Sequence, residues 1–146
     1  FRWRRDVDAP GMAPWYRDHW IWRRTGITRA DGRTLEDQRS DPASLWLWYR
    51  RLIALRRSSP ALGRGECTLL ESGHPDVLAF RRSYRDEVVT VVTHLGSTTA
   101  RLPPDSPANP AGDTLVGEGG DGRELGPWAV RIVLESGARA ARSTVA

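Results

Sequence analysis

The 146-residue chain contains no lysine: all 22 of its basic residues are arginine, against 18 acidic residues, for a net charge of +4. Proteins that bind phosphate backbones generally use both basic residue types and gather them on one surface. Here acidic residues are interspersed with the arginines, except in the segment Arg50 to Arg57. The missing lysine therefore indicates a coding bias, and the charge pattern argues against a nucleic-acid partner.

Cysteine and long apolar runs are scarce as well. Cys67 is the single cysteine, which excludes an internal disulfide. No run of eighteen apolar residues is present, so membrane insertion is not expected. The sequence opens on Phe1 rather than methionine, and we expect it to be part of a longer polypeptide. The compartment in which the protein works is not indicated.

Motifs that hold metals or cofactors are missing too. The three histidines, His19, His74 and His94, are dispersed, and neither C-x-x-C nor H-E-x-x-H occurs. The stretch Gly117 to Gly122 matches G-x-G-x-x-G by letter, but the turn pair Gly126-Pro127 follows it instead of a helix, so we predict a loop. We expect no cofactor and no bound metal.

The sequence also lacks a recognisable set of catalytic groups. Two pairs of neighbouring carboxylates, Glu36-Asp37 and Asp86-Glu87, lie in segments that we expect to be solvated. No G-x-S-x-G nucleophile motif is present. The sequence therefore predicts no catalytic residue within this chain.

One helix is predicted over residues 42–57, after an irregular loop at residues 1–40. Asp41 is expected to cap its N-terminus, with Pro42 at the first helical position and Ser58 to Pro60 ending it. Apolar side chains recur at spacings of three and four, which gives the helix one apolar face. These residues are Leu45, Trp48, Tyr49, Leu52, Ile53 and Leu55.

Beyond Leu62 the pattern changes to short strands rich in valine, leucine and threonine. The second and third strands are expected to form a hairpin. Both alternate faces of Val88 to Val92 are apolar, which predicts a strand in the middle of a sheet. The predicted strands are residues 67–71, 77–83, 87–95, 100–102, 114–116 and 128–134, with a loop at 103–112.

Tryptophan is abundant where other signals are weak, because four of the seven tryptophans fall within the first 22 residues. Six indoles, if buried at about 200 Å² each, would contribute on the order of 30 kcal/mol of transfer free energy. Few small domains leave so much apolar area exposed. Three interpretations remain open at this point: the rings dock against other protein, stack on sugars in an independent carbohydrate-binding module, or stack on nucleic-acid bases.

The predicted helix and the residues that follow it resemble those of a known protein family. Ser40 to Leu45, continued by Tyr49 to Arg57, resembles a phrase of the type D-P-x-S-L-L-x-x-Y-R-R-L-I-x-L-R in the α-amylase family, glycoside hydrolase family 13. In that family the phrase lies in the last helix of a (β/α)₈ barrel. Pro60 to Leu62 and Gly65 resemble the stretch that leads into the family's C-terminal β-domain.

The resemblance continues downstream. His74 to Arg82 and Val88 to Val92 resemble the first hairpin of that β-domain, and Leu125 to Val130 resembles its last strand. One departure is His94, at a position where family members usually carry asparagine.

The resemblance implies an α+β fold in which a barrel-remnant helix is followed by an antiparallel β-sandwich. Residues 1–62 would be the remnant of the last βα unit of the barrel, residues 63–136 the C-terminal sandwich domain, and residues 137–146 a flexible tail. The missing catalytic barrel of the same polypeptide would then be the partner of this part.

The family implies an enzyme that hydrolyses or transfers α-glucosyl units with retention, acting on α-glucans such as starch and maltodextrin or on α-glucosides. Its aspartate nucleophile, its glutamate acid/base and a second aspartate lie on earlier barrel strands, so this chain is expected to be structural and inactive alone. Phe1 to Trp3 and Pro14-Trp15 resemble the segments that follow the eighth strand. Trp3 and Trp15 are therefore expected nearest the substrate in the intact enzyme.

Overall fold

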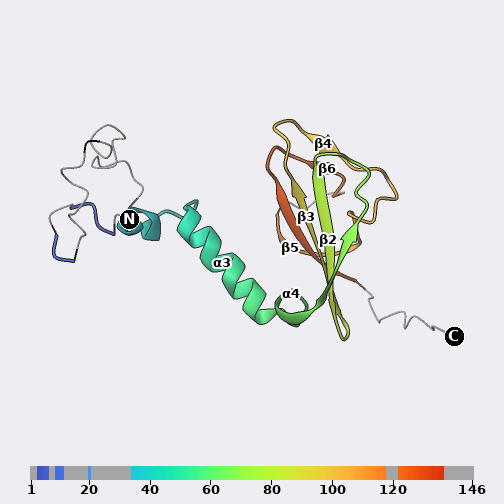
Figure 1. The fold of residues 1–146 in the computed structure, drawn as a ribbon, viewed down its shortest axis with the longest axis horizontal. Coiled ribbons are helices and arrows are strands. Elements are labelled where there is room, and N and C mark those ends of the chain that lie inside the picture. The colour runs from blue at the N-terminus through green and yellow to red at the C-terminus, as the bar shows by residue number, and fades with distance from the viewer. Residues whose placement is uncertain (1–2, 7–8, 12–19, 21–33, 118–121, 137–146) are drawn as a thin grey trace. The chain divides into compact units, whose positions relative to one another are not determined.

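The computed structural model describes residues 3–6, 9–11, 20, 34–117 and 122–136 (Figure 1). The chain divides into two compact units, Phe1–Leu55 and Arg56–Ala146. The helices are α2 (Leu35–Ser40), α3 (Leu45–Ser58) and α4 (Pro60–Arg64). The strands are β1 (Glu66–Leu70), β2 (Val77–Tyr84), β3 (Glu87–His94), β4 (Ala100–Arg101), β5 (Gly112–Val116), β6 (Glu124–Leu125) and β7 (Val130–Glu135).

Helix α2 lies in a segment that was predicted to be irregular, and for these six residues that prediction is wrong. Thr34 caps the helix: its hydroxyl accepts the N–H of Asp37 at 3.1 Å, and the Asp37 carboxylate accepts the N–H of Thr34 at 3.2 Å. This reciprocal capping box satisfies two backbone donors that a helix start otherwise leaves free. A six-residue helix has little stability of its own, so the cap matters more here than in a longer helix.

The predicted central helix is present as α3, but it begins one turn later than expected. Asp41 does not cap it. Its carboxylate instead accepts the N–H of Ala43 at 2.9 Å, and its carbonyl accepts that of Ser44 at 3.0 Å, which makes a separate turn around Pro42. Ser44 takes the capping position, where its hydroxyl accepts the N–H of Leu47 at 3.3 Å.

Helix α4 explains why α3 ends where it does. The predicted stop at Ser58 is confirmed, but Pro60 also begins this short helix, at a position where its missing N–H costs no hydrogen bond. Ser59 caps α4 by accepting the N–H of Leu62 at 3.1 Å. The hydroxyl of Ser59 also donates to the carboxylate of Glu87 in β3. The prediction that Glu87 lies in a solvated segment is therefore wrong for its carboxylate.

Gly65 connects α4 to the first strand through a space that admits no side chain. A Cβ at this position would lie 2.5 Å from the carbonyl oxygen of Ala61 and 2.8 Å from that of Ser83. Both neighbours are backbone atoms that belong to α4 and β2. The glycine that resembles the family's domain junction is therefore required by the close approach of two chain segments.

Five strands form one antiparallel sheet in the order β1-β2-β3-β7-β5 (Figure 1). The expected hairpin of β2 and β3 is confirmed, with Phe80 opposite Val91. Val91 also lies opposite Ile132 of β7, so β3 is the central strand, as the apolar residues on both of its faces predicted. The two-residue hairpin turn places Arg85 at a φ of 54°.

A second, two-stranded sheet of β4 and β6 completes the sandwich. Strand β6 was not predicted, and the last predicted strand begins at Val130 instead of Trp128, because residues 126–129 form a turn. The core draws side chains from both sheets and from the loop between them. Its members are Val77, Ala79, Val92, Ala100, Leu102, Ala108 and Leu125, all at most 8% exposed.

Candidate substrate-proximal site

Trp3, one of the two tryptophans expected near substrate, lies beside the start of α2. Its carbonyl accepts the N–H of Glu36 at 3.1 Å, and its side chain is 52% exposed. An open hollow of about 400 Å³ is lined here by Trp3, Arg4, Leu35, Glu36 and Arg39. Trp15, the second expected residue, lies outside the described residues, so the structure places only Trp3 at this site.

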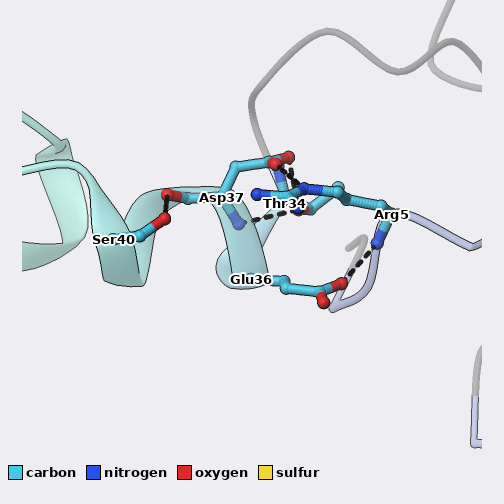
Figure 2. A network of polar contacts seen from close by, with 5 residues as sticks. All are labelled: Arg5, Thr34, Glu36, Asp37 and Ser40. Carbon is cyan, nitrogen blue, oxygen red and sulfur yellow. Dashed lines mark hydrogen bonds and ion pairs between the residues drawn. The ribbon is translucent and has the colours of Figure 1, made fainter.

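A polar network fixes Arg5 against α2 (Figure 2). The backbone N–H of Arg5 donates to the Glu36 carboxylate at 3.0 Å, and its guanidinium pairs with the Asp37 carboxylate. Asp37 also accepts the hydroxyl of Thr34 at 2.5 Å. Residues more than thirty positions apart in sequence are thereby joined, and the network holds the segment of Trp3 against the helix.

The network also sets the protonation of its members. The hydrogen bond from Thr34, followed by the one from Arg5, lowers the pKa of Asp37 below its ordinary value. The hydrogen bond and charge of Asp37 raise the pKa of Arg5. Because hydrogen bonds and an opposite charge both favour the ionised carboxylate, Asp37 is an anion at neutral pH.

The lowered pKa of Asp37 predicts how this site responds to acid. The stabilisation that comes from the ionised carboxylate is present above the ordinary aspartate pKa of about 3.9, and it is lost as the pH falls through the lowered value. We expect the Asp37 carboxyl resonance, followed by NMR, to titrate below that of an exposed aspartate. Thr34→Ala and Arg5→Gln should each raise its midpoint, because each removes a contact that lowers the pKa of Asp37.

Arg4 provides the matched control, because it is adjacent in sequence and lines the same hollow. Arg4→Gln should leave the titration midpoint of Asp37 where it is. If Arg4→Gln and Arg5→Gln shifted the midpoint equally, general surface charge would be responsible, and the specific ion pair would be excluded.

The arrangement suits binding better than acid/base catalysis. The carboxylates of Glu36 and Asp37 both accept structural hydrogen bonds, and the pair was already expected not to be catalytic. An exposed indole beside charged side chains can stack on one ligand face and hydrogen-bond to its edge. No group of three or more His, Cys, Asp or Glu side chains in the described part of the chain is placed to hold a metal ion.

The other described tryptophans are exposed or half-buried. Among the five that the structure describes, Trp3, Trp20 and Trp128 are more than half exposed, and none is buried. Trp46 of α3 has the guanidinium groups of Arg50 and Arg39 over its ring, at 4.7 and 5.6 Å from the centroid. Arginine over an indole face is a favourable cation–π arrangement.

Sequence reasoning missed four residues of the hollow. These are Arg4, together with Leu35, Glu36 and Arg39, whose segment was predicted to be a loop. A usable signal was present. Thr34 precedes Asp37 by three positions, which is the spacing of a capping box, with aspartate in place of the commoner glutamate. That spacing would have predicted the helix, although not the contact with Trp3.

Comparison with known proteins places this fold among sugar-processing enzymes, although no family model matches the chain. The chain is 26% identical over 95 residues to α-amylase 3 of Dictyoglomus thermophilum, covering 65% of this chain and 18% of that protein. It is 35% identical over 68 residues to a probable α-glucosidase of Rhizobium meliloti, covering 47% and 12%. It is 41% identical over 66 residues to a trehalose synthase of Thermus thermophilus, covering 44% and 7%.

Solved structures of sugar-converting enzymes also match this chain. The trehalulose synthase MutB of Pseudomonas mesoacidophila MX-45 matches with a TM-score of 0.58 and 27% identity, over 69% of this chain and 19% of that one. A MutB mutant in complex with sucrose matches equally well. The chain is thus similar in sequence and in fold to enzymes of the α-amylase family, glycoside hydrolase family 13. Its sandwich corresponds to the C-terminal β-domain of the α-amylase family, as the resemblance of β2, β3 and β7 implied.

The match covers only a small part of each relative. The chain spans less than a fifth of the length of these three curated relatives of the α-amylase family, with shares of 18%, 12% and 7%. No helix in the described ranges is long and apolar enough to cross a membrane.

Proposed function

We propose that this chain is the C-terminal portion of an α-amylase-family glycoside hydrolase or transglycosidase that acts on α-glucans or α-glucosides. The observation that carries the proposal is the combination of its β-sandwich with sequence similarity to an α-amylase, an α-glucosidase and a trehalose synthase. These relatives include enzymes named for hydrolysis and for synthesis, so both reaction types belong to the proposal. The same relatives give no support to the alternative of an independent carbohydrate-binding module.

In this proposal the chain supplies structure, and the chemistry comes from elsewhere in a longer polypeptide. Retaining glycosidases need two carboxyl groups about 5–5.5 Å apart, one as nucleophile and one as acid/base. The Glu36 and Asp37 carboxylates are held by Arg5 and Thr34. Glu135 accepts from Arg81 at 2.8 Å and from Thr90 at 2.5 Å. These carboxylates stabilise the local fold through the contacts that they accept.

Residues 1–62 would complete the last βα unit of the catalytic barrel, residues 63–136 would form the C-terminal domain and residues 137–146 a tail. Support comes from α3, none of whose residues is buried. Leu45, Tyr49 and Ile53 are 64%, 59% and 48% exposed, and a spacing of four places them on one helix face. In the proposed enzyme this face packs against the barrel, and Trp3 and Trp15 lie on the rim near the α-glucan.

The proposal predicts that the 146-residue chain alone releases no glucose from maltodextrin or starch. The reason is that the barrel strands whose C-terminal ends carry the catalytic acids are supplied by another part of the polypeptide. Glucose release is measured by a coupled assay on chain purified to homogeneity. Turnover that co-purifies with the chain and follows its concentration would overturn the structural role.

A further inference from the structure

His94, the last residue of β3, is a fully buried histidine that bonds to the turn between β6 and β7. Its backbone N–H donates to the carbonyl of Ala129 at 2.9 Å. Its ring Nδ1 lies 2.7 Å from the carbonyl oxygen of Gly126. Because a carbonyl only accepts, Nδ1 carries the hydrogen of this bond. His94 therefore holds both ends of the turn at residues 126–129.

The turn has a strained backbone that these contacts maintain. Trp128 has a φ of 57°, which is unusual for any residue other than glycine and is an outlier for a bulky one. Its N–H donates to the carbonyl of Gly96 at 3.2 Å, two residues beyond His94. Such strain persists only where the surroundings enforce it. Loss of the bonds from residues 94–96 would therefore let the turn open.

The second ring nitrogen of His94 has a different environment. Nε2 is buried and has no hydrogen-bond partner among the residues that the structure describes. Gly96 lies directly against it, because a Cβ at that position would be only 2.6 Å from Nε2. With the hydrogen on Nδ1, a neutral ring leaves a lone pair on Nε2. Protonation would instead place a donor and a charge in this buried site, and both are costly without an acceptor.

His74, in the connection between β1 and β2, does not provide that acceptor. Its ring meets the ring of His94 edge to face, with the centroids 6.0 Å apart. Nδ1 of His74 accepts the N–H of Asp76 at 3.2 Å, so the hydrogen of the neutral ring lies on its Nε2. Neither nitrogen of His74 can then accept a hydrogen from His94. Charging both rings would also bring two like charges together.

The other charged side chains of the neighbouring elements do not bond to Nε2 of His94 either. Asp76 is exposed, and its backbone carbonyl accepts the N–H of Leu95 at 2.8 Å. The guanidinium of Arg131 in β7 donates to two backbone carbonyls. The remaining charged residues of the second sheet and its loops are Arg101, Asp105, Arg123 and Glu124.

We propose that His94 makes the turn at residues 126–129 an acid-sensitive switch, which opens when the imidazole takes up a proton. In the closed turn the buried ring is neutral, whereas in the open turn both ring nitrogens reach water and the charged ring is favoured. An exposed histidine has a pKa of about 6.5. Because the open form binds more protons, the closed turn is fully stable above that pH and loses stability as the pH falls below it. This inference rests on the contacts of His94 and is independent of the proposed function.

The test measures amide hydrogen exchange in the full 146-residue chain by NMR at pH 7.5 and pH 5.5. We expect the protection factor of the Trp128 amide, which is bonded to Gly96, to fall about tenfold between these pH values. The Gly63 amide, bonded to Ser59 at the start of α4, is the internal reference, and its protection should not change. Both pH values lie above the range in which Asp37 titrates.

His94→Asn is the decisive variant, because asparagine carries a side-chain N–H donor but does not titrate. The protection factor of the Trp128 amide should then be equal at the two pH values. Asp76→Asn is the matched control, since it removes a neighbouring carboxylate, and it should leave the tenfold fall in place.

The inference is overturned if protection of Trp128 in the unaltered chain stays the same or rises at pH 5.5. It is also overturned if Gly63 loses protection to the same extent, if His94→Asn keeps the fall, or if Asp76→Asn abolishes it. The comparison of Trp128 with Gly63 in the unaltered chain decides the matter even if His94→Asn does not fold.

Discussion

Replacing Leu102 with alanine is expected to lower the free energy of unfolding of the β-domain by about 2–5 kcal/mol. Leu102 is fully buried in the cluster that joins the two sheets, between Ala100 of β4 and the loop that carries Ala108. Its backbone N–H also donates to the carbonyl of Arg123 at 2.7 Å, which keeps the surrounding chain from closing over a cavity. Urea unfolding followed by circular dichroism measures the change in stability.

The control for this prediction is the same substitution at an exposed leucine. Leu69 of β1 is 74% exposed, so Leu69→Ala should change the stability by no more than about 0.5 kcal/mol. If the two variants lost equal stability, the cluster around Leu102 would not be the core that joins the sheets.

A triple substitution on α3, Leu45→Gln, Tyr49→Gln and Ile53→Gln, is expected to abolish most hydrophobic-dye binding and self-association of the chain. These three side chains expose a continuous apolar stripe. Full burial of each would contribute about 1.5–3 kcal/mol, which is enough to drive contact with any apolar surface. Glutamine keeps a good helix propensity, so α3 itself should persist. Dye fluorescence and sedimentation velocity measure the two effects.

Charged residues of the same helix provide the comparison. Arg56→Gln and Arg57→Gln change exposed positions without altering the apolar stripe, and should leave dye binding nearly unchanged. Dye binding that survives the triple substitution would show that the exposed apolar surface of the chain lies elsewhere, and it would remove the main structural support for a barrel-facing helix.

The elements that sequence predicted best are those with strong local signals. The apolar spacing within Leu45–Ser58 predicted α3, because a helix face needs that period. The central place of β3 followed from apolar residues on both of its faces, since only an inner strand is covered on both sides. The hairpin followed from the short connection at Arg85.

The elements that sequence missed depend on contacts made across the chain. Strand β6 has two residues, Glu124 and Leu125, and exists through its pairing with β4. Helix α2 relies on Thr34 and on Arg5, whose partner Asp37 is 32 positions away. The start of α3 was predicted too early because an aspartate can either cap a helix or form a turn with the residues that follow it. The side chain of Asp41 forms such a turn with Ala43 and does not cap α3.

The candidate sites also depend on contacts between residues that are distant in sequence. Tryptophan abundance and the family resemblance pointed to Trp3, but its hollow is completed by Leu35, Glu36 and Arg39, which only the folded arrangement brings together. Trp128 was read as part of a strand, and its positive φ was not foreseeable because that conformation is enforced by Gly96 and Ala129 rather than by its own preference.

The most direct test of this account is the rate of glucose release from maltodextrin by a polypeptide that joins the region encoded upstream of Phe1 to the 146-residue chain. We expect release by the joined polypeptide and none by the chain alone. Equal rates from both, or an inactive joined polypeptide whose upstream region lacks paired catalytic carboxylates, would contradict it.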